Sequence, residues 1–191
     1  MAAIATTLLG LLKTGDHVLI NRAVYGETIA LLNDVLSRYG IEASYADFTD
    51  LPSVEQGIRS NTKLLYTEVI ANPLTVIADI EAIAAIAKQH GLLTVVDSTF
   101  TTPCVFRPLD VGADVVIHSL TKYFGGHSDL TGGSITASKE LVSRLTTAYL
   151  LLGCCLDPNS AWLFGRSART LAMRVRKQNE NAAAVAKALA E

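Results

Sequence analysis

Short apolar runs alternate along this chain with longer segments in which apolar residues recur every three or four positions. The runs predict buried strands and the periodic segments predict helices. Strands are predicted at 17–21, 42–46, 63–69, 92–97, 115–118 and 133–138. Helices are predicted at 1–13, 27–39, 51–59, 80–90, 139–151 and 157–191, the last broken near Gly165. This alternation predicts a three-layer α/β fold with a mostly parallel sheet between helices.

Composition narrows the class of protein. The chain has 191 residues, of which 50% are hydrophobic, and this is enough for one well-buried domain. We expect an α/β core over residues 1–155 and a helical segment over residues 156–191. The net charge of −2 is spread without blocks, which argues against a nucleic-acid partner. No apolar stretch reaches bilayer length, so no contact with a membrane is expected.

Cysteine and histidine usage points to a reducing compartment and to no metal site. The three cysteines are odd in number and poorly spaced for disulfides, which favours a cytoplasmic protein. The four histidines lack metal-ligand spacing. His118 lies inside an apolar run and is expected to be a core residue with its hydrogen bonds satisfied.

A lysine near the middle of the chain is the first candidate for chemistry. Lys122 follows the apolar run 115–118 and is flanked by Ser119, Thr121 and a pair of glycines. An amine at the mouth of a buried strand can form a Schiff base if partial burial and nearby positive groups lower its pKa. Taken alone, Lys122 is also explained as an ordinary residue at a strand–loop junction.

A second polar residue lies at the end of the preceding predicted strand. Asp97 ends the run 92–97, and twenty-five positions separate it from Lys122. That separation allows one strand to leave the sheet, cross over and return parallel, so both residues fall at strand carboxyl ends. Pyridoxal phosphate needs an anion at its ring nitrogen and an amine at its aldehyde. The pair therefore predicts a site for this cofactor.

Several ordered motifs support the same cofactor. They are Met1-Ala-Ala-Ile4, Ala23-Val-Tyr25-Gly26, Ala71-Asn72-Pro73, Val96-Asp97-Ser98-Thr99, Ser119-Leu-Thr121-Lys122-Tyr-Phe-Gly-Gly-His127 and Arg169-Thr-Leu-Ala-Met-Arg174. Together they resemble the Cys/Met-metabolism family of pyridoxal-phosphate enzymes, which includes cystathionine γ-synthase, cystathionine γ- and β-lyases and methionine γ-lyase. The resemblance implies the large cofactor-binding domain of the aspartate-aminotransferase type (fold type I). It also implies trans-sulfuration chemistry, a sulfur amino-acid substrate, and a homo-oligomer built as a dimer of dimers.

The resemblance also implies roles for individual residues. Lys122 would carry the cofactor and move protons, Asp97 would pair with the ring nitrogen, and Tyr25 would stack on the ring and serve the leaving group. Ser119 and Thr121, two apart on an extended segment, would share a face and hold the phosphate. The turn at Met1 would add backbone groups, because a helix N-terminus suits a dianion. The expected catalytic residues are Lys122 and Tyr25, and the expected cofactor contacts are Met1, Tyr25, Asn72, Asp97, Ser119, Thr121 and Lys122.

Three of these residues also have simpler explanations. Asp97 can be a helix cap after a strand, Tyr25 a half-buried aromatic in a loop, and Asn72 part of an Asn-Pro turn. In the family, the asparagine equivalent to Asn72 bonds the phenolic oxygen of the cofactor.

Two alternatives to a complete trans-sulfuration enzyme remain open. Relatives carry an N-terminal arm and a C-terminal domain that supply phosphate and carboxylate ligands, so we expect this chain to be the core of a longer enzyme. As a separate chain it would then be a truncated, catalytically incompetent cofactor-binding fragment. A nucleotide-binding domain is less consistent, because no glycine-rich fingerprint follows the first strand. The sequence does not distinguish elimination from replacement.

Overall fold

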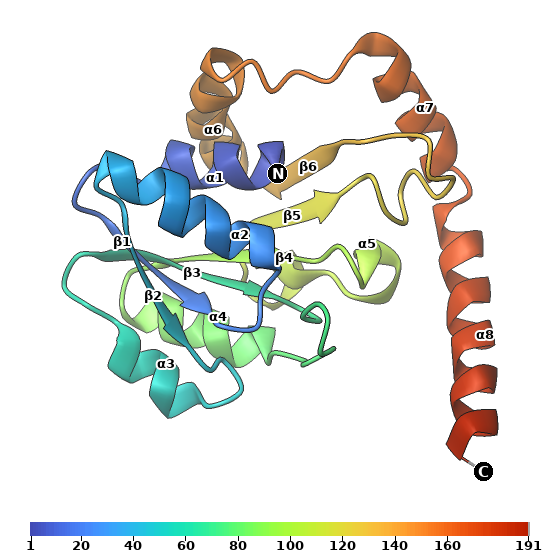
Figure 1. The fold of residues 1–191 in the computed structure, drawn as a ribbon, viewed down its shortest axis with the longest axis horizontal. Coiled ribbons are helices and arrows are strands. Elements are labelled where there is room, and N and C mark those ends of the chain that lie inside the picture. The colour runs from blue at the N-terminus through green and yellow to red at the C-terminus, as the bar shows by residue number, and fades with distance from the viewer. Residues whose placement is uncertain (191) are drawn as a thin grey trace.

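A six-stranded sheet lies between two layers of helices in the computed structural model, which describes residues 1–190 (Figure 1). The strands are β1 (His17–Asn21), β2 (Glu42–Ala46), β3 (Thr62–Glu68), β4 (Leu93–Asp97), β5 (Val115–Ser119) and β6 (Gly133–Ala137). Their order is β2-β1-β3-β4-β5-β6. All neighbours pair in parallel except β6, which pairs antiparallel with β5. The predicted α/β fold with a mostly parallel sheet is confirmed.

The helical elements connect these strands. They are α1 (Ala2–Leu11), α2 (Gly26–Ala30), the π-helical η1 (Leu31–Val35), the 3₁₀-helical η2 (Leu36–Tyr39), α3 (Leu51–Gly57), α4 (Ile80–Gln89), α5 (Thr102–Val105), the 3₁₀-helical η3 (Pro108–Val111), α6 (Lys139–Leu151), α7 (Pro158–Ala168) and α8 (Leu171–Ala190). None of the helices within residues 1–190 combines the length and apolar character that crossing a bilayer requires.

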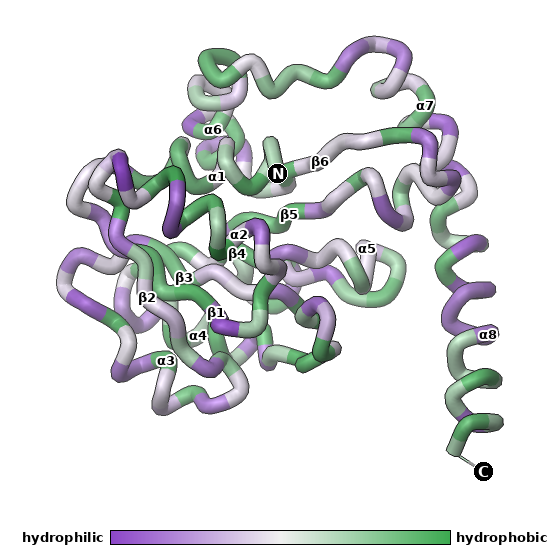
Figure 2. Tube along the Cα trace, in the orientation of Figure 1, coloured by the Kyte–Doolittle hydropathy of each residue, from purple (hydrophilic) through white to green (hydrophobic). Residues whose placement is uncertain are grey.

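Two apolar cores follow from the alternation of side chains along the strands. Val18 and Ile20 of β1 belong to the core under α1, α2 and α6, whereas Leu19 belongs to the core over α3 and α4. Leu64 and Leu65 of β3 divide in the same way. Because successive strand residues point to opposite faces, a continuous apolar run is needed when both faces are covered. Figure 2 shows these apolar runs along the sheet, while the outer part of α8 is mixed in hydropathy.

Two predicted helices differ in detail from the structure. The segment predicted at 27–39 is helical but passes through α-, π- and 3₁₀-helical turns. The predicted break near Gly165 is wrong, because α7 runs through this glycine and the break falls at Arg169 and Thr170. At the break, the Thr170 hydroxyl and the Arg174 guanidinium donate to the Ser167 carbonyl at 3.1 Å each. Side-chain donors thus satisfy a carbonyl at the end of α7.

The strand order creates a crevice at the carboxyl ends of the strands. β2 and β3 lie on opposite sides of β1, so the chain changes direction beside β1. Open α/β sheets bind ligands at such a point. On the other side of β3, the chain leaves β4 and returns in β5 as a parallel neighbour, as the spacing of Asp97 and Lys122 predicts. Asp97 ends β4 and Ser119 ends β5, so both lie at this edge.

Candidate active site

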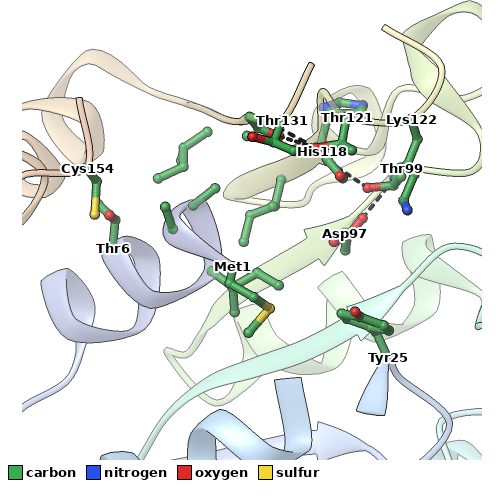
Figure 3. Close-up of a pocket in the computed structure, with 18 of the residues that line it drawn as sticks. Met1, Thr6, Tyr25, Asp97, Thr99, His118, Thr121, Lys122, Thr131 and Cys154 are labelled. Carbon is green, nitrogen blue, oxygen red and sulfur yellow. Dashed lines mark hydrogen bonds between the residues drawn. The ribbon is translucent and has the colours of Figure 1, made fainter. Parts of the chain in front are cut away.

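A cavity of about 810 Å³ lies at this edge of the sheet (Figure 3). Residues from the ends of β3, β4 and β5, the loop after β1, the start of α1 and the side of α6 line it. The seven residues predicted from the sequence all do so: Met1, Tyr25, Asn72, Asp97, Ser119, Thr121 and Lys122. The fold therefore brings together side chains that come from five separate segments of the chain.

Lys122 and Asp97 face the same space. Lys122 follows β5 in a turn closed by its own N–H, which donates to the Ser119 carbonyl at 3.2 Å. In Figure 3 its amine extends into the cavity on the side of Asp97, with the Tyr25 ring below them. A single planar ligand lying over the strand ends can thus meet an amine, a carboxylate and an aromatic ring.

A short hydrogen-bonded relay holds the carboxylate of Asp97. The Thr99 N–H donates to Oδ1 of Asp97 at 2.9 Å, and the Ser119 N–H donates to the Thr99 hydroxyl at 2.8 Å. Burial raises the pKa of Asp97, although Thr99 acts in the opposite direction. No lysine or arginine within residues 1–190 forms an ion pair with Asp97. A cationic ligand group would therefore stabilise the negative charge of this partly buried carboxylate.

Glu68 is a buried carboxylate at the site, and it is not among the residues predicted from the sequence. It is the last residue of β3 and the register partner of Asp97 in β4, and it is 6% exposed. Its Oε1 accepts the Tyr25 N–H at 2.8 Å, and its Oε2 accepts the Asn72 N–H at 3.3 Å. One carboxylate thus joins the two loops that carry Tyr25 and Asn72. A carboxylate at the end of a buried strand, the pattern that identified Asp97, also describes Glu68.

Burial raises the pKa of Glu68 to about 7, with the nearby Asp97 charge adding to the shift and the two N–H donors opposing it. Because this value exceeds the ordinary 4.5, the folded protein retains a proton that the unfolded chain releases between about pH 4.5 and pH 7. Stability present at low pH is therefore lost as the pH rises through this window. The loss amounts to about 3 kcal/mol at about 1.4 kcal/mol per unit.

Glutamine in place of Glu68 is expected to remove this pH dependence. The free energy of unfolding of the wild-type protein should fall by about 3 kcal/mol between about pH 5 and pH 8, on top of the slope left in E68Q. Urea titrations at both pH values measure the two slopes. Comparing slopes cancels any constant loss from the hydrogen bond that glutamine cannot make. Equal slopes in the two proteins would contradict this role of Glu68.

The hydroxyl groups near Lys122 are arranged differently from the prediction. Residues 119–121 were expected to be extended, but only Ser119 belongs to β5 and Thr121 lies in the following turn. The Thr121 hydroxyl accepts the Gly132 N–H at 3.0 Å and lies 3.3 Å from the Gly132 carbonyl. Because the chain turns at Lys122, Thr121 does not continue the strand. Its hydroxyl instead connects this turn, called the lysine turn below, to Gly132 in the segment before β6. Thr131, also a hydroxyl residue, joins the lining of the cavity.

The first turn of α1 supplies backbone donors to the same region. Ala2, Ala3 and Ile4 line the cavity, and first-turn N–H groups have no acceptor within their own helix. A Cβ at Gly133 would lie 2.8 Å from the Ala3 Cβ, so this glycine permits the close approach of α1 to β6. Hydroxyls and free amides together suit an oxyanion such as phosphate.

His118 lines the cavity but does not have the satisfied environment that was expected. It is 6% exposed, and its Nε2 has no hydrogen-bond partner. Burial lowers its pKa to about 4, so the ring is neutral at physiological pH. Its contact with Phe124 is edge-to-face, with ring centroids 5.4 Å apart. The alternation of the strand explains its burial, but an aromatic neighbour supplies no acceptor.

Charges and metal ligands in the site are few. Among residues 1–190, Lys122 is the only lysine or arginine that lines the cavity. Within residues 1–190, no group of three or more histidine, cysteine, aspartate or glutamate side chains is placed to hold a metal ion. The polar groups that line the site therefore include the Lys122 amine, two carboxylates, the Asn72 carboxamide, the neutral His118 ring, hydroxyls and backbone amides.

Comparisons with known proteins identify the family of this chain. The family model described as Cys/Met metabolism PLP-dependent enzyme matches residues 1–191, and the chain belongs to that family of pyridoxal-phosphate-dependent enzymes. The chain is 45% identical over 187 residues to the cystathionine gamma-lyase of Bacillus subtilis, covering 97% of this chain and 49% of that protein. It is 44% identical over 191 residues to the canavanine gamma-lyase of Rhizobium leguminosarum, covering 99% of this chain and 48% of that protein.

A solved structure shares the fold. The crystal structure of cystathionine gamma-lyase from Lactobacillus plantarum complexed with L-serine superposes with a TM-score of 0.96 at 38% identity. The match covers 100% of this chain and 50% of that one. The chain thus spans about half the length of the relatives it matches, and these relatives include lyases and synthases of different specificity.

Proposed function

We propose that this chain binds pyridoxal 5'-phosphate in the cavity and is the cofactor-binding core of an enzyme that eliminates or replaces the β or γ substituent of sulfur amino acids. The observation that carries the proposal is the pairing in one cavity of the Lys122 amine with the partly buried Asp97 carboxylate. Membership of a pyridoxal-phosphate-dependent family supports it. The names of the relatives, which include a cystathionine gamma-lyase and a cystathionine beta-lyase, support the substrate class.

The residues fit the cofactor on physical grounds. Asp97 is partly buried and forms no ion pair with a lysine or arginine of residues 1–190, and a protonated ring nitrogen would provide a cationic partner. The free amides of α1, with the hydroxyls of Ser119 and Thr131, suit a phosphate. When bound, pyridoxal phosphate supplies an aldehyde for an amine and a ring that accepts an electron pair.

The named site residues would then have the following roles. Asp97 keeps the proton on the ring nitrogen, and the relay through Thr99 to Ser119 holds its carboxylate in place. Lys122 Nζ would hold the cofactor, and its neutral amine could accept a proton from the substrate Cα in the same cavity. Tyr25 would cover the cofactor ring, and Asn72 would bind its phenolic oxygen. Glu68 fixes both of these last residues through their backbone N–H groups.

A second function, cofactor binding without turnover, is favoured by one observation. Both the cofactor phosphate and the substrate carboxylate are anions, yet Lys122 is the only lysine or arginine that lines the cavity. Catalysis would then depend on cationic groups that lie outside the described residues. Binding alone requires fewer of them, because amides and hydroxyls can hold the phosphate.

Two measurements test the proposal. Purified protein should turn yellow with pyridoxal phosphate, lose the colour on borohydride treatment, and carry the label on the peptide that contains Lys122. Ammonia and 2-oxo acid release from cystathionine, methionine and cysteine should then be assayed. Release from any of them supports the enzyme, and labelling without release supports the second function. Absence of a label would contradict both.

A further inference from the structure

The turn that carries Lys122 is held from outside the sheet by the corner between α7 and α8. Figure 1 shows the loop between β5 and β6 reaching this corner. The Arg174 guanidinium donates from Nη1 to the Tyr123 carbonyl at 2.7 Å and from Nη2 to the Phe124 carbonyl at 3.2 Å. These are the two residues directly after Lys122, and they lie 51 and 50 positions before Arg174 in the chain.

The guanidinium is itself fixed on the other side. Its Nη2 also donates to the Ser167 carbonyl at 3.1 Å, and its Nε donates to the Thr170 hydroxyl at 3.1 Å. A planar guanidinium with donors in a rigid fork can serve all these acceptors at once. Arg174 therefore joins the end of α7, the start of α8 and the lysine turn through one group.

Two glycines and one aromatic ring complete the contact. Gly126 has a φ of +73°, and a Cβ at this position would lie 2.2 Å from Nη1 of Arg174, so only glycine admits the guanidinium. A Cβ at Gly132 would lie 2.7 Å from the Phe164 ring, which is 5% exposed. Phe164 and Arg174 thus enclose the loop between β5 and β6.

Only the first turns of α8 are packed against the rest of the protein. Only Leu171 and Val175 are buried in this helix, so its first turns are anchored and the remainder is exposed. Neither residue belongs to the two main cores of the sheet. The anchored part of α8 therefore contacts α5, α7 and the turn after Lys122 rather than the sheet.

We infer that Arg174 is a positioning residue, which holds the turn after β5 so that the Lys122 amine points into the cavity. This inference rests on the proposed role of Lys122. The guanidinium touches neither the cavity nor the amine and acts through the carbonyls of Tyr123 and Phe124. A displaced turn would misplace the amine, and a shift of about 1 Å in a reacting group can cost on the order of 100-fold in rate.

The test compares R174A with R176A in three measurements. Arg176 lies two residues further along α8 and is exposed, so its removal controls for loss of an arginine from this helix. In R174A, the rate of borohydride-fixed labelling of Lys122 by pyridoxal phosphate should fall at least about tenfold, and R176A should match the wild type. Affinity for pyridoxine 5'-phosphate, which lacks the aldehyde, should stay within about twofold in both, because Arg174 does not line the cavity.

Hydrogen exchange in cofactor-free protein separates this inference from the proposed function. The N–H groups of Gly125 and Gly126 bond within the turn at 2.8 Å each and should exchange about tenfold faster in R174A, while those of β3 and β4 stay unchanged. R174K should restore part of the protection, since an ammonium reaches fewer of the acceptors.

Each failure has its own meaning. Missing label in the wild type contradicts the proposed function, whereas unchanged exchange and labelling in R174A overturn the inference alone. Faster exchange throughout the sheet, a parallel loss of pyridoxine phosphate affinity, or failure of both Arg174 variants to fold would assign Arg174 to general stability and also overturn it.

Discussion

Alanine in place of Lys122 is expected to abolish covalent attachment of pyridoxal phosphate. Within residues 1–190, Lys122 is the only lysine that lines the cavity, so no other lysine side chain can replace it there. The variant should show no borohydride-fixed label in the cavity, and any amino-acid turnover should fall by on the order of 10³-fold or more, the scale of losing an essential catalytic group. Absorbance titration and peptide mass analysis measure both effects.

Two controls decide what a loss in K122A means. Lys139→Ala removes an exposed lysine at the start of α6 and should label like the wild type. K122R keeps a positive charge at the turn but cannot condense with an aldehyde, and it should remain unlabelled. A label retained in K122A at the wild-type level would show that the cofactor attaches elsewhere and would refute the site.

Asparagine in place of Asp97 is expected to weaken function and strengthen the cofactor-free fold. A hydrogen bond to a charged group is worth about 1.5–3 kcal/mol, so affinity for pyridoxal phosphate should fall about tenfold to 100-fold. Turnover, where the wild type shows it, should fall further, because the ring nitrogen is no longer held protonated. Spectroscopic titration of the cofactor and assays of ammonia release measure these effects.

The stability of the cofactor-free protein should rise in D97N, whereas its cofactor affinity should fall. Burial raises the pKa of Asp97, so the folded state disfavours the ionised form, and stability is lost as the pH rises through the folded pKa. D97N carries no charge and can still accept the Thr99 N–H, so its cofactor-free form should unfold at a higher urea concentration than the wild type at neutral pH. Asp34→Asn, at an exposed position on η1, is the matched control. A D97N protein that is less stable than the wild type would show that the carboxylate serves the fold.

The local pattern of the chain was sufficient for the architecture and for the pairing of Lys122 with Asp97 in space. Continuous apolar runs mark strands buried on both faces, and a crossover between parallel strands brings their carboxyl ends to one edge. Both features depend on residues close together in the sequence and on the short menu of connections in α/β folds. Family motifs added Met1, Tyr25, Asn72, Ser119 and Thr121, and the structure brings all of them to the same cavity.

The supporting contacts required the tertiary structure. Glu68 meets the Tyr25 N–H across 43 positions, and Arg174 meets the Tyr123 carbonyl across 51. Neither contact can be read from a sequence pattern. Every non-proline residue offers the same backbone N–H and carbonyl, so the residue type does not show which backbone group is bound. The hydrogen bond from the Gly132 N–H to the Thr121 hydroxyl and the bonds at the break between α7 and α8 also involve backbone groups, so the sequence does not predict them either. Strand positions follow from local alternation, whereas the contacts that hold the turn after Lys122 depend on which distant segments the fold brings together.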